Sequence, residues 1–100
     1  MDRSTALSIL KRNEAELRLL GVSSLSIFGS TAREDVNELS DIDVAVKFLP
    51  GPRGLARVKR TELLRRRLLA LLGRPVDVIE EPARSPRVQK AIQRDRVVAF

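Results

Sequence analysis

Apolar residues recur every three or four positions in some stretches of this chain and every second position in others. In residues 4–20, leucine and isoleucine recur at roughly helical spacing, Ser4 can cap the first turn and Gly21 can end the last. Residues 22–28 are apolar and β-branched enough for a strand. The pattern therefore predicts a helix over 4–20 and a strand over 22–28.

The spacing at which apolar residues recur changes again in the middle of the chain. Gly29 and Ser30 end the first strand, and residues 31–36 can form a short helix that leads into a loop over 37–40. Residues 41–48 read Asp-Ile-Asp-Val-Ala-Val-Lys-Phe, and apolar residues take every second position at their start. This alternation predicts a second strand.

Two further elements follow in the second half. Proline and glycine at 50–54 break the chain before a long helix that reaches about residue 72, and residues 76–80 form a short apolar strand. A loop over 82–86 precedes a last helix, with Pro86 in its first turn, that reaches about residue 97. The order α-β-α-β-α-β-α predicts a small α/β or α+β fold with three strands and helices packed on them.

The composition limits both size and chemistry. One hundred residues predict a single domain over 1–100, with a core small enough that a homo- or hetero-oligomer or a partner would add stability. Cysteine and histidine are absent, which excludes disulfides, thiol nucleophiles, Cys/His zinc sites and Ser-His pairs. Any chemistry must use carboxylates, hydroxyls, amines or metal ions on oxygen ligands.

The charge is uneven along the chain. The net charge is +6, and residues 51–100 hold 13 basic and 5 acidic side chains, against 6 and 8 in residues 1–50. The basic half suits an anionic partner such as a nucleoside triphosphate, a nucleic acid or an acidic protein, while a solvated arginine-rich face is the alternative. No apolar run reaches the roughly 18 residues of a membrane span, and the first four residues do not open a signal peptide, so a cytoplasmic location and no membrane contact are expected.

Three aspartates are candidates for a metal site. Asp41 and Asp43 are two residues apart on a predicted strand, so their side chains share a face with Cα atoms about 7 Å apart. Asp77 interrupts another apolar strand, and the three carboxylates converge if the two strands are neighbours. Oxygen ligands suit Mg²⁺ or Mn²⁺, and three acids can hold two such ions about 4 Å apart around a phosphoryl group. The alternative is a turn or cap aspartate at 41 and a surface residue on an edge strand at 77.

A glycine–serine turn is the candidate phosphate site. Gly29 and Ser30 leave a strand and enter a helix, where a close backbone approach, exposed N–H groups and a hydroxyl suit a phosphate. Arg33 lies one turn further on and could reach a phosphate or pair with an acid. The alternative is an ordinary turn with Ser30 as N-cap. The chain has neither the dinucleotide-binding nor the P-loop glycine pattern.

Taken together, three segments resemble a known family. Gly-Ser-Thr-Ala-Arg at 29–33, Ser-Asp-Ile-Asp-Val-Ala-Val at 40–46 and Val-Asp-Val at 76–78 are similar to the nucleotidyltransferase domain of the DNA polymerase β superfamily, and most of all to the minimal nucleotidyltransferases. The resemblance covers most of the chain and implies a nucleotidyltransferase-like fold with a small mixed sheet. Glu34 and Asp35 depart from the pattern, because members often carry glycine there; we expect them to add helical propensity and negative charge.

The resemblance also implies roles for these residues. Gly29 and Ser30 would hold the triphosphate of ATP, with a supporting role for Arg33. Asp41 and Asp43 would bind two Mg²⁺ ions, and Asp77 would complete the site for the ion that activates the attacking hydroxyl. The implied reaction is transfer of AMP from ATP to a hydroxyl.

Minimal nucleotidyltransferases resemble the antitoxins of toxin–antitoxin pairs whose toxin is a helical HEPN-type ribonuclease, and the implied acceptor is a tyrosine of that toxin. One alternative is an antitoxin that neutralises its partner by binding without catalysis. Another alternative is a small-molecule nucleotidyltransferase. Such enzymes resemble this domain but have an additional helical domain, which this sequence lacks. Direct nucleic-acid binding is not expected, because the chain has no recognised reading motif.

Overall fold

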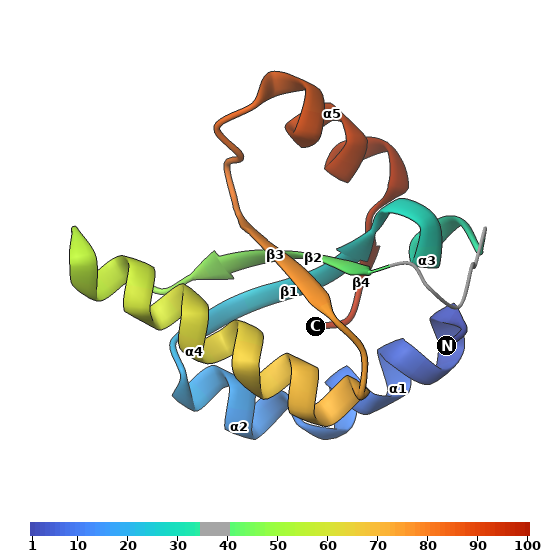
Figure 1. Ribbon diagram of the computed structural model, residues 1–100, viewed down its shortest axis with the longest axis horizontal. Helices are drawn as coiled ribbons and strands as arrows, with labels where there is room; N and C mark the ends of the chain where they lie inside the picture. The colour runs from blue at the N-terminus through green and yellow to red at the C-terminus, as the bar shows by residue number, and fades with distance from the viewer. Residues whose placement is uncertain (35–40) are drawn as a thin grey trace.

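The computed structural model describes residues 1–34 and 41–100 and shows a sheet with helices on both faces (Figure 1). The sheet has four strands in the order β3-β2-β1-β4. Their bounds are β1 (Val22–Phe28), β2 (Ile42–Phe48), β3 (Val76–Glu80) and β4 (Val97–Val98). The helices α1 (Arg3–Arg12), α2 (Glu14–Leu19) and α4 (Leu55–Leu72) cover one face, α5 (Pro86–Asp95) lies over the other, and the short α3 (Gly29–Arg33) follows β1.

The strand directions follow from the connections. β1 pairs antiparallel with β2 on one side and with β4 on the other. β2 and β3 pair parallel, and the long helix α4 makes the crossover that a parallel pair requires.

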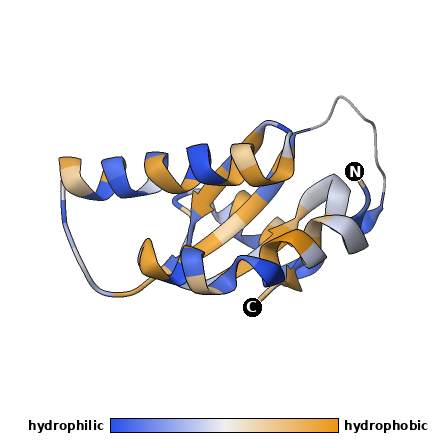
Figure 2. Cartoon of the chain, turned by 90° about the horizontal axis from the view of Figure 1, so that it is seen from below, coloured by the Kyte–Doolittle hydropathy of each residue, from blue (hydrophilic) through white to orange (hydrophobic). Residues whose placement is uncertain are grey.

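Figure 2 shows hydrophobic and hydrophilic residues alternating along α4. Within the described parts of the chain, no helix has both the length and the apolar character needed to cross a membrane.

The two faces of the sheet are covered to different degrees. Alternation along β2 sends Val44 and Val46 into the main core with α1, α2 and α4, while Ala45 faces α5. The cluster under α5 is small; its buried members are Phe28, Ala45 and Ile92. α5 therefore covers only part of its face, and the face that carries Asp43 stays open beside it.

The C-terminus forms a fourth strand, where the sequence pattern predicted three strands and a helix to about residue 97. α5 ends at Asp95, and the backbone of Arg96 is no longer helical, with φ −50° and ψ 126°. β4 pairs with β1, and the N–H of Ala99 donates to the carbonyl of Leu25 at 2.8 Å. Ala99 is buried in the main core, so burial and strand pairing outweigh continuation of the helix.

The first predicted helix is two helices. Asn13 ends α1, and its side-chain amide donates to the carbonyl of Ile9 at 2.7 Å. Such side-chain bonds to the backbone compete with helical geometry and favour helix ends. Asp2, not Ser4, caps the N-terminus by accepting from the N–H of Thr5 at 2.8 Å.

The helix predicted over 31–36 begins and ends earlier. α3 starts at Gly29 and ends at Arg33, so Glu34 does not extend the helix as expected. Glu34 has a φ of 61°, in the left-handed region that favours glycine. This backbone conformation gives a physical reason for the glycine that the resemblance implies at this place. The predicted loop over 37–40, together with Asp35, lies outside the described residues.

Candidate active site

Two of the predicted acidic residues lie opposite each other on neighbouring strands. Asp43 on β2 is in register with Asp77 on β3. The start of β2 is tied to the start of β3, because the N–H of Ile42 donates to the carbonyl of Pro75 at 2.9 Å. Asp41 directly precedes β2 and is exposed. The sheet register thus brings two acids from distant parts of the chain together, with the third two residues from Asp43.

The environment of Asp43 makes its charge unfavourable. Burial, and then the negative charges of Asp77 and Asp41, raise the pKa of Asp43 from 3.8 to about 6, while Arg33 acts in the opposite direction. Asp77 itself is exposed, so it avoids the cost of an unpaired buried carboxylate. A half-buried carboxylate flanked by two others is a place where a cation stabilises the ionised form.

Gly29 makes room for the Asp43 side chain. Its φ is 70°, which turns the chain from β1 into α3. A methyl group on Gly29 would overlap Oδ2 of Asp43 and lie 3.2 Å from its Cγ. The preceding residue, Phe28, pairs with Asp43 across the β1–β2 ladder. The structure therefore brings the glycine of the predicted phosphate turn against a predicted metal ligand.

Ser30 and Arg33 lie on the same short helix. Ser30 is half-buried in the first turn of α3. Nη1 of Arg33 donates to Oδ2 of Asp95 on α5 at 2.6 Å. The hydrogen bonds from Arg94 and then Arg33 lower the pKa of Asp95 to about 2. Arg33 thus connects α3 to α5 beside Asp43, a tertiary partner that sequence reasoning missed because Asp95 is 62 residues away.

The acidic residues fit a divalent ion by their chemistry. The donors are all carboxylate oxygens, the set that Mg²⁺ prefers, and the missing side chain of Gly29 lets the Asp43 carboxylate lie against the turn. Over residues 1–34 and 41–100, no group of three acidic side chains lies close enough together to hold a metal ion as the structure stands.

The raised pKa of Asp43 predicts that Mg²⁺ affinity depends on pH. Below about pH 6 the ion has to displace a proton from Asp43, so the affinity should fall roughly tenfold per pH unit. Above that pH it should level off. Titration with Mg²⁺ from pH 5 to 8 by calorimetry checks this, and a flat profile would contradict it.

The same shift predicts the opposite trend for folding without metal. Asp43 holds its proton more tightly in the folded state, so its contribution to the free energy of unfolding is present below about pH 4 and lost as the pH rises to about 6. Solvent screens this half-buried group, so the loss should be on the order of 1 kcal/mol. Urea unfolding at pH 4 and 7, compared between the wild type and Asp43→Asn, measures it.

Comparison with known proteins places these residues in a family. The family model described as "Nucleotidyltransferase domain" matches residues 6–99. The protein adenylyltransferase MntA of Thermococcus cleftensis is 34% identical over 91 residues, which cover 90% of this chain and 88% of that protein. A solved structure described as a candidate minimal nucleotidyltransferase superposes with a TM-score of 0.72 at 32% identity and covers 97% of this chain and 95% of its own.

Two more distant structures share the fold. A crystal structure of a toxin–antitoxin with AMP-PNP has a TM-score of 0.66 at 19% identity and covers 100% of this chain and 73% of its own. The tri-AMPylated HEPN toxin of Shewanella oneidensis in complex with its MNT antitoxin has a TM-score of 0.58 at 18% identity, covering 89% of this chain and 70% of the matched chain. The predicted nucleotidyltransferase-like fold is confirmed, and the chain belongs to the nucleotidyltransferase domain family.

Proposed function

We propose that this protein transfers AMP from ATP to a hydroxyl group of a partner protein, and that the acceptor is a tyrosine of a HEPN-type toxin that it thereby silences. A relative with 34% identity is named a protein adenylyltransferase, which supports the reaction. Fold neighbours are toxin–antitoxin complexes, one of them with a tri-AMPylated HEPN toxin, which supports the partner. The absence of histidine and cysteine is compatible with this chemistry, because nucleotidyl transfer depends on positioning and electrostatics.

The observation that carries the proposal is the pairing of Asp43 with Asp77 across β2 and β3, with Asp41 nearby and Gly29 against Asp43. In the proposed reaction, an acceptor oxygen bonds to the α-phosphorus of ATP, the bond from that phosphorus to pyrophosphate breaks, and the hydroxyl proton passes to water. Developing negative charge on phosphate oxygens would be repelled by the carboxylates alone. A divalent cation held by these acids would offset that repulsion.

Each residue has one task in this proposal. Asp41, Asp43 and Asp77 would hold Mg²⁺, which when bound neutralises the triphosphate and makes the attacking hydroxyl more acidic. Gly29 and Ser30 would hold the triphosphate by close backbone approach and a donated hydroxyl. Arg33 acts as a positioning residue, because its ion pair with Asp95 joins α3 to α5 beside the site.

Labelled ATP tests the proposal. The protein and a co-expressed HEPN-type partner are incubated with Mg²⁺ and ATP labelled at the α or the γ phosphate, and we expect label on the partner from the α position alone. The label should be lost with Asp41→Asn and retained with Asp2→Asn, a control that preserves the α1 cap. Label from the γ position would point to a kinase reaction. Silencing of the partner without any label would favour the binding-only antitoxin.

A further inference from the structure

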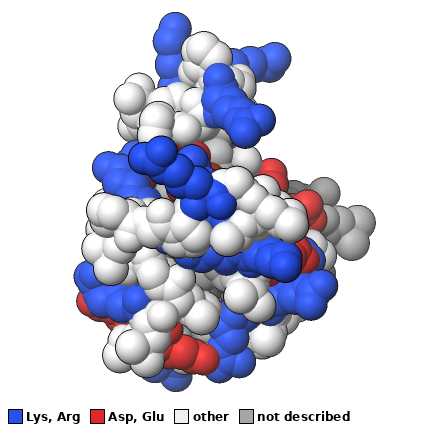
Figure 3. Space-filling view, turned by 90° about the vertical axis from the view of Figure 1, so that its left-hand side faces the viewer, with Lys and Arg blue, Asp and Glu red and all other residues white. Residues whose placement is uncertain are grey.

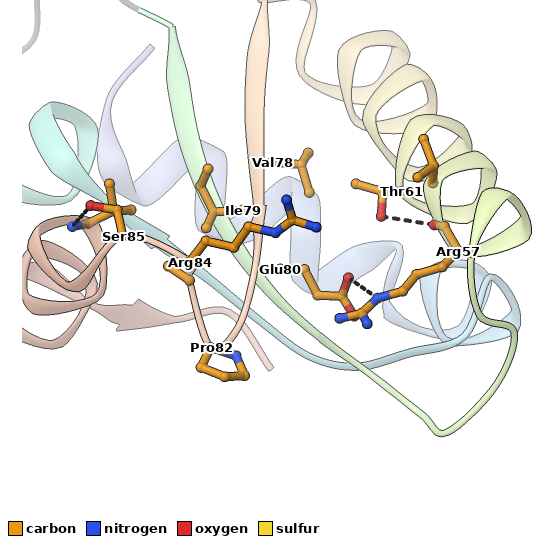
Figure 4. Close-up of a pocket in the computed structure, with 12 residues that line it drawn as sticks. Arg57, Thr61, Val78, Ile79, Glu80, Pro82, Arg84 and Ser85 are labelled. Atoms are coloured by element: carbon orange, nitrogen blue, oxygen red, sulfur yellow. Dashed lines mark hydrogen bonds and ion pairs between the residues drawn. The ribbon is translucent and has the colours of Figure 1, made fainter.

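A hollow lies along the outer edge of β3, apart from the acidic site. It has a volume of about 670 Å³ and lies between α4 and the segment that joins β3 to α5 (Figure 4). Apolar side chains form about half of its walls; they are Val58, Val78, Ile79, Pro82, Ala83 and Val88. Val58 is 63% exposed and its neighbour one turn earlier, Leu55, is 69% exposed. The hollow therefore offers apolar surface that the rest of the described chain leaves uncovered.

The backbone beside this hollow is an open strand edge. β3 is the first strand in the order β3-β2-β1-β4, so its inner side pairs with β2 and, among the described residues, no strand pairs with its outer side. Free N–H and C=O groups along such an edge can pair with an added extended segment. Alternate side chains of that segment would then fill the apolar hollow.

The charge around the hollow is basic. Figure 3 shows this side of the molecule, where Lys and Arg cover more of the surface than Asp and Glu. The Arg84 side chain extends over β3 into the hollow (Figure 4) and has no ion-pair partner in the described parts of the chain. Arg57 and Glu80 also line the hollow. They form an ion pair with each other, in which Nε of Arg57 is 2.8 Å from Oε2 of Glu80. An occupant with acidic side chains complements Arg84.

The hollow and the acidic site share one strand. Ile79 lines the hollow, and Asp77 lies two residues before it on β3. At about 3.3 Å per strand residue, the two positions are about 7 Å apart. A segment paired along β3 thus places its residues next to the position of Asp77.

We infer that the edge of β3 is the docking site for the acceptor protein: an extended, acidic segment adds to β3 as a fifth strand, with Arg84 binding its carboxylates and apolar side chains in the hollow. This inference rests on the proposed function, which supplies the acceptor. A nucleic acid fits less well, because apolar side chains form much of the walls and no aromatic side chain lines them for base stacking.

A model peptide tests the docking site without ATP. The peptide alternates glutamate and valine around a central tyrosine, and its counterpart has lysine in place of glutamate. We expect the acidic peptide to shift the backbone amide NMR signals of Val78 and Ile79, the basic peptide to leave them unchanged, and Arg84→Glu to weaken binding at least tenfold. Lys59→Glu, an equal charge change on an exposed α4 residue outside the hollow, should change binding less than twofold. Absent shifts, equal binding of both peptides, or stronger shifts from an oligouridine would overturn the inference.

A second measurement separates this inference from the proposed function. With the HEPN-type partner as acceptor, Arg84→Glu and Val58→Asp should raise KM for the partner at least tenfold and leave kcat and the affinity for AMP-PNP within twofold. Unchanged KM with intact AMP transfer would overturn the docking site while the proposed function stands. Peptide binding at β3 without any AMP transfer would support the docking site and reject the proposed function.

Discussion

Asp43→Asn is expected to lower nucleotidyl transfer by about 10²–10³-fold or more, because it removes the charge of one of the carboxylates that we propose hold a divalent cation. Asp43 is the central member of the acidic group: it pairs with Asp77 in the sheet and senses the charge of Asp41. Asparagine has nearly the shape and size of aspartate, but it carries no negative charge to balance a divalent cation. The readout is the rate of label transfer from α-labelled ATP at saturating Mg²⁺.

The same variant is expected to fold at least as well as the wild type. Burial and the two neighbouring carboxylates disfavour the charged form of Asp43, and an uncharged amide avoids both costs. At pH 7 without metal, the free energy of unfolding should rise by on the order of 1 kcal/mol, after allowing for solvent screening of a half-buried group. Urea unfolding gives this value. Wild-type transfer rates in a folded Asp43→Asn would remove Asp43 from the metal site.

Gly29→Ala is expected to lower both activity and stability. A φ of 70° costs an alanine about 1–2 kcal/mol, and the added methyl would overlap Oδ2 of Asp43 and force that side chain to move. Displacing a ligand by about 1 Å is enough to lower the rate about 10²-fold. We therefore expect transfer to fall by about that factor and the urea midpoint to decrease.

Gly73 provides a matched control for this variant. It has a φ of 67° at the C-terminus of α4, and a methyl group there would meet nothing within 4 Å. Gly73→Ala thus reports the backbone strain alone, and transfer should stay within twofold of wild type. In an Asp43→Ala background, Gly29→Ala should cost only about as much stability as Gly73→Ala. An equal loss of activity in both single variants would show that the contact with Asp43 has no role.

The local pattern of apolar and polar residues predicted much of this fold. The alternation in β2, which begins at Ile42, follows from residue spacing, because neighbouring side chains on a strand point to opposite faces. Leu64, Leu68 and Leu72 recur at helical spacing and are the buried residues of α4. The family resemblance is confirmed, whereas the assignment of individual residues to metal and nucleotide remains a prediction.

The sequence pattern did not predict the features that depend on residues far apart in the chain. β4 is only Val97–Val98 and exists because β1 pairs with it, so no periodicity could reveal it. The ion pair between Arg33 and Asp95 joins α3 to α5 across 62 positions. The division of the first helix depends on one asparagine side chain, a local competition that a hydrophobic period does not report.

By itself, the amino-acid sequence determined the available chemistry, which is oxygen ligands without histidine or cysteine, and the two-residue spacing of Asp41 and Asp43. Both depend only on residue type and near spacing. Only the tertiary structure decided that Asp77 meets Asp43, that Gly29 packs on that carboxylate, and that the edge of β3 stays open. The register of β3 is set by its pairing with β2, and the chain reaches that edge of the sheet through the crossover helix α4. Both features join distant parts of the chain, and no short segment encodes them.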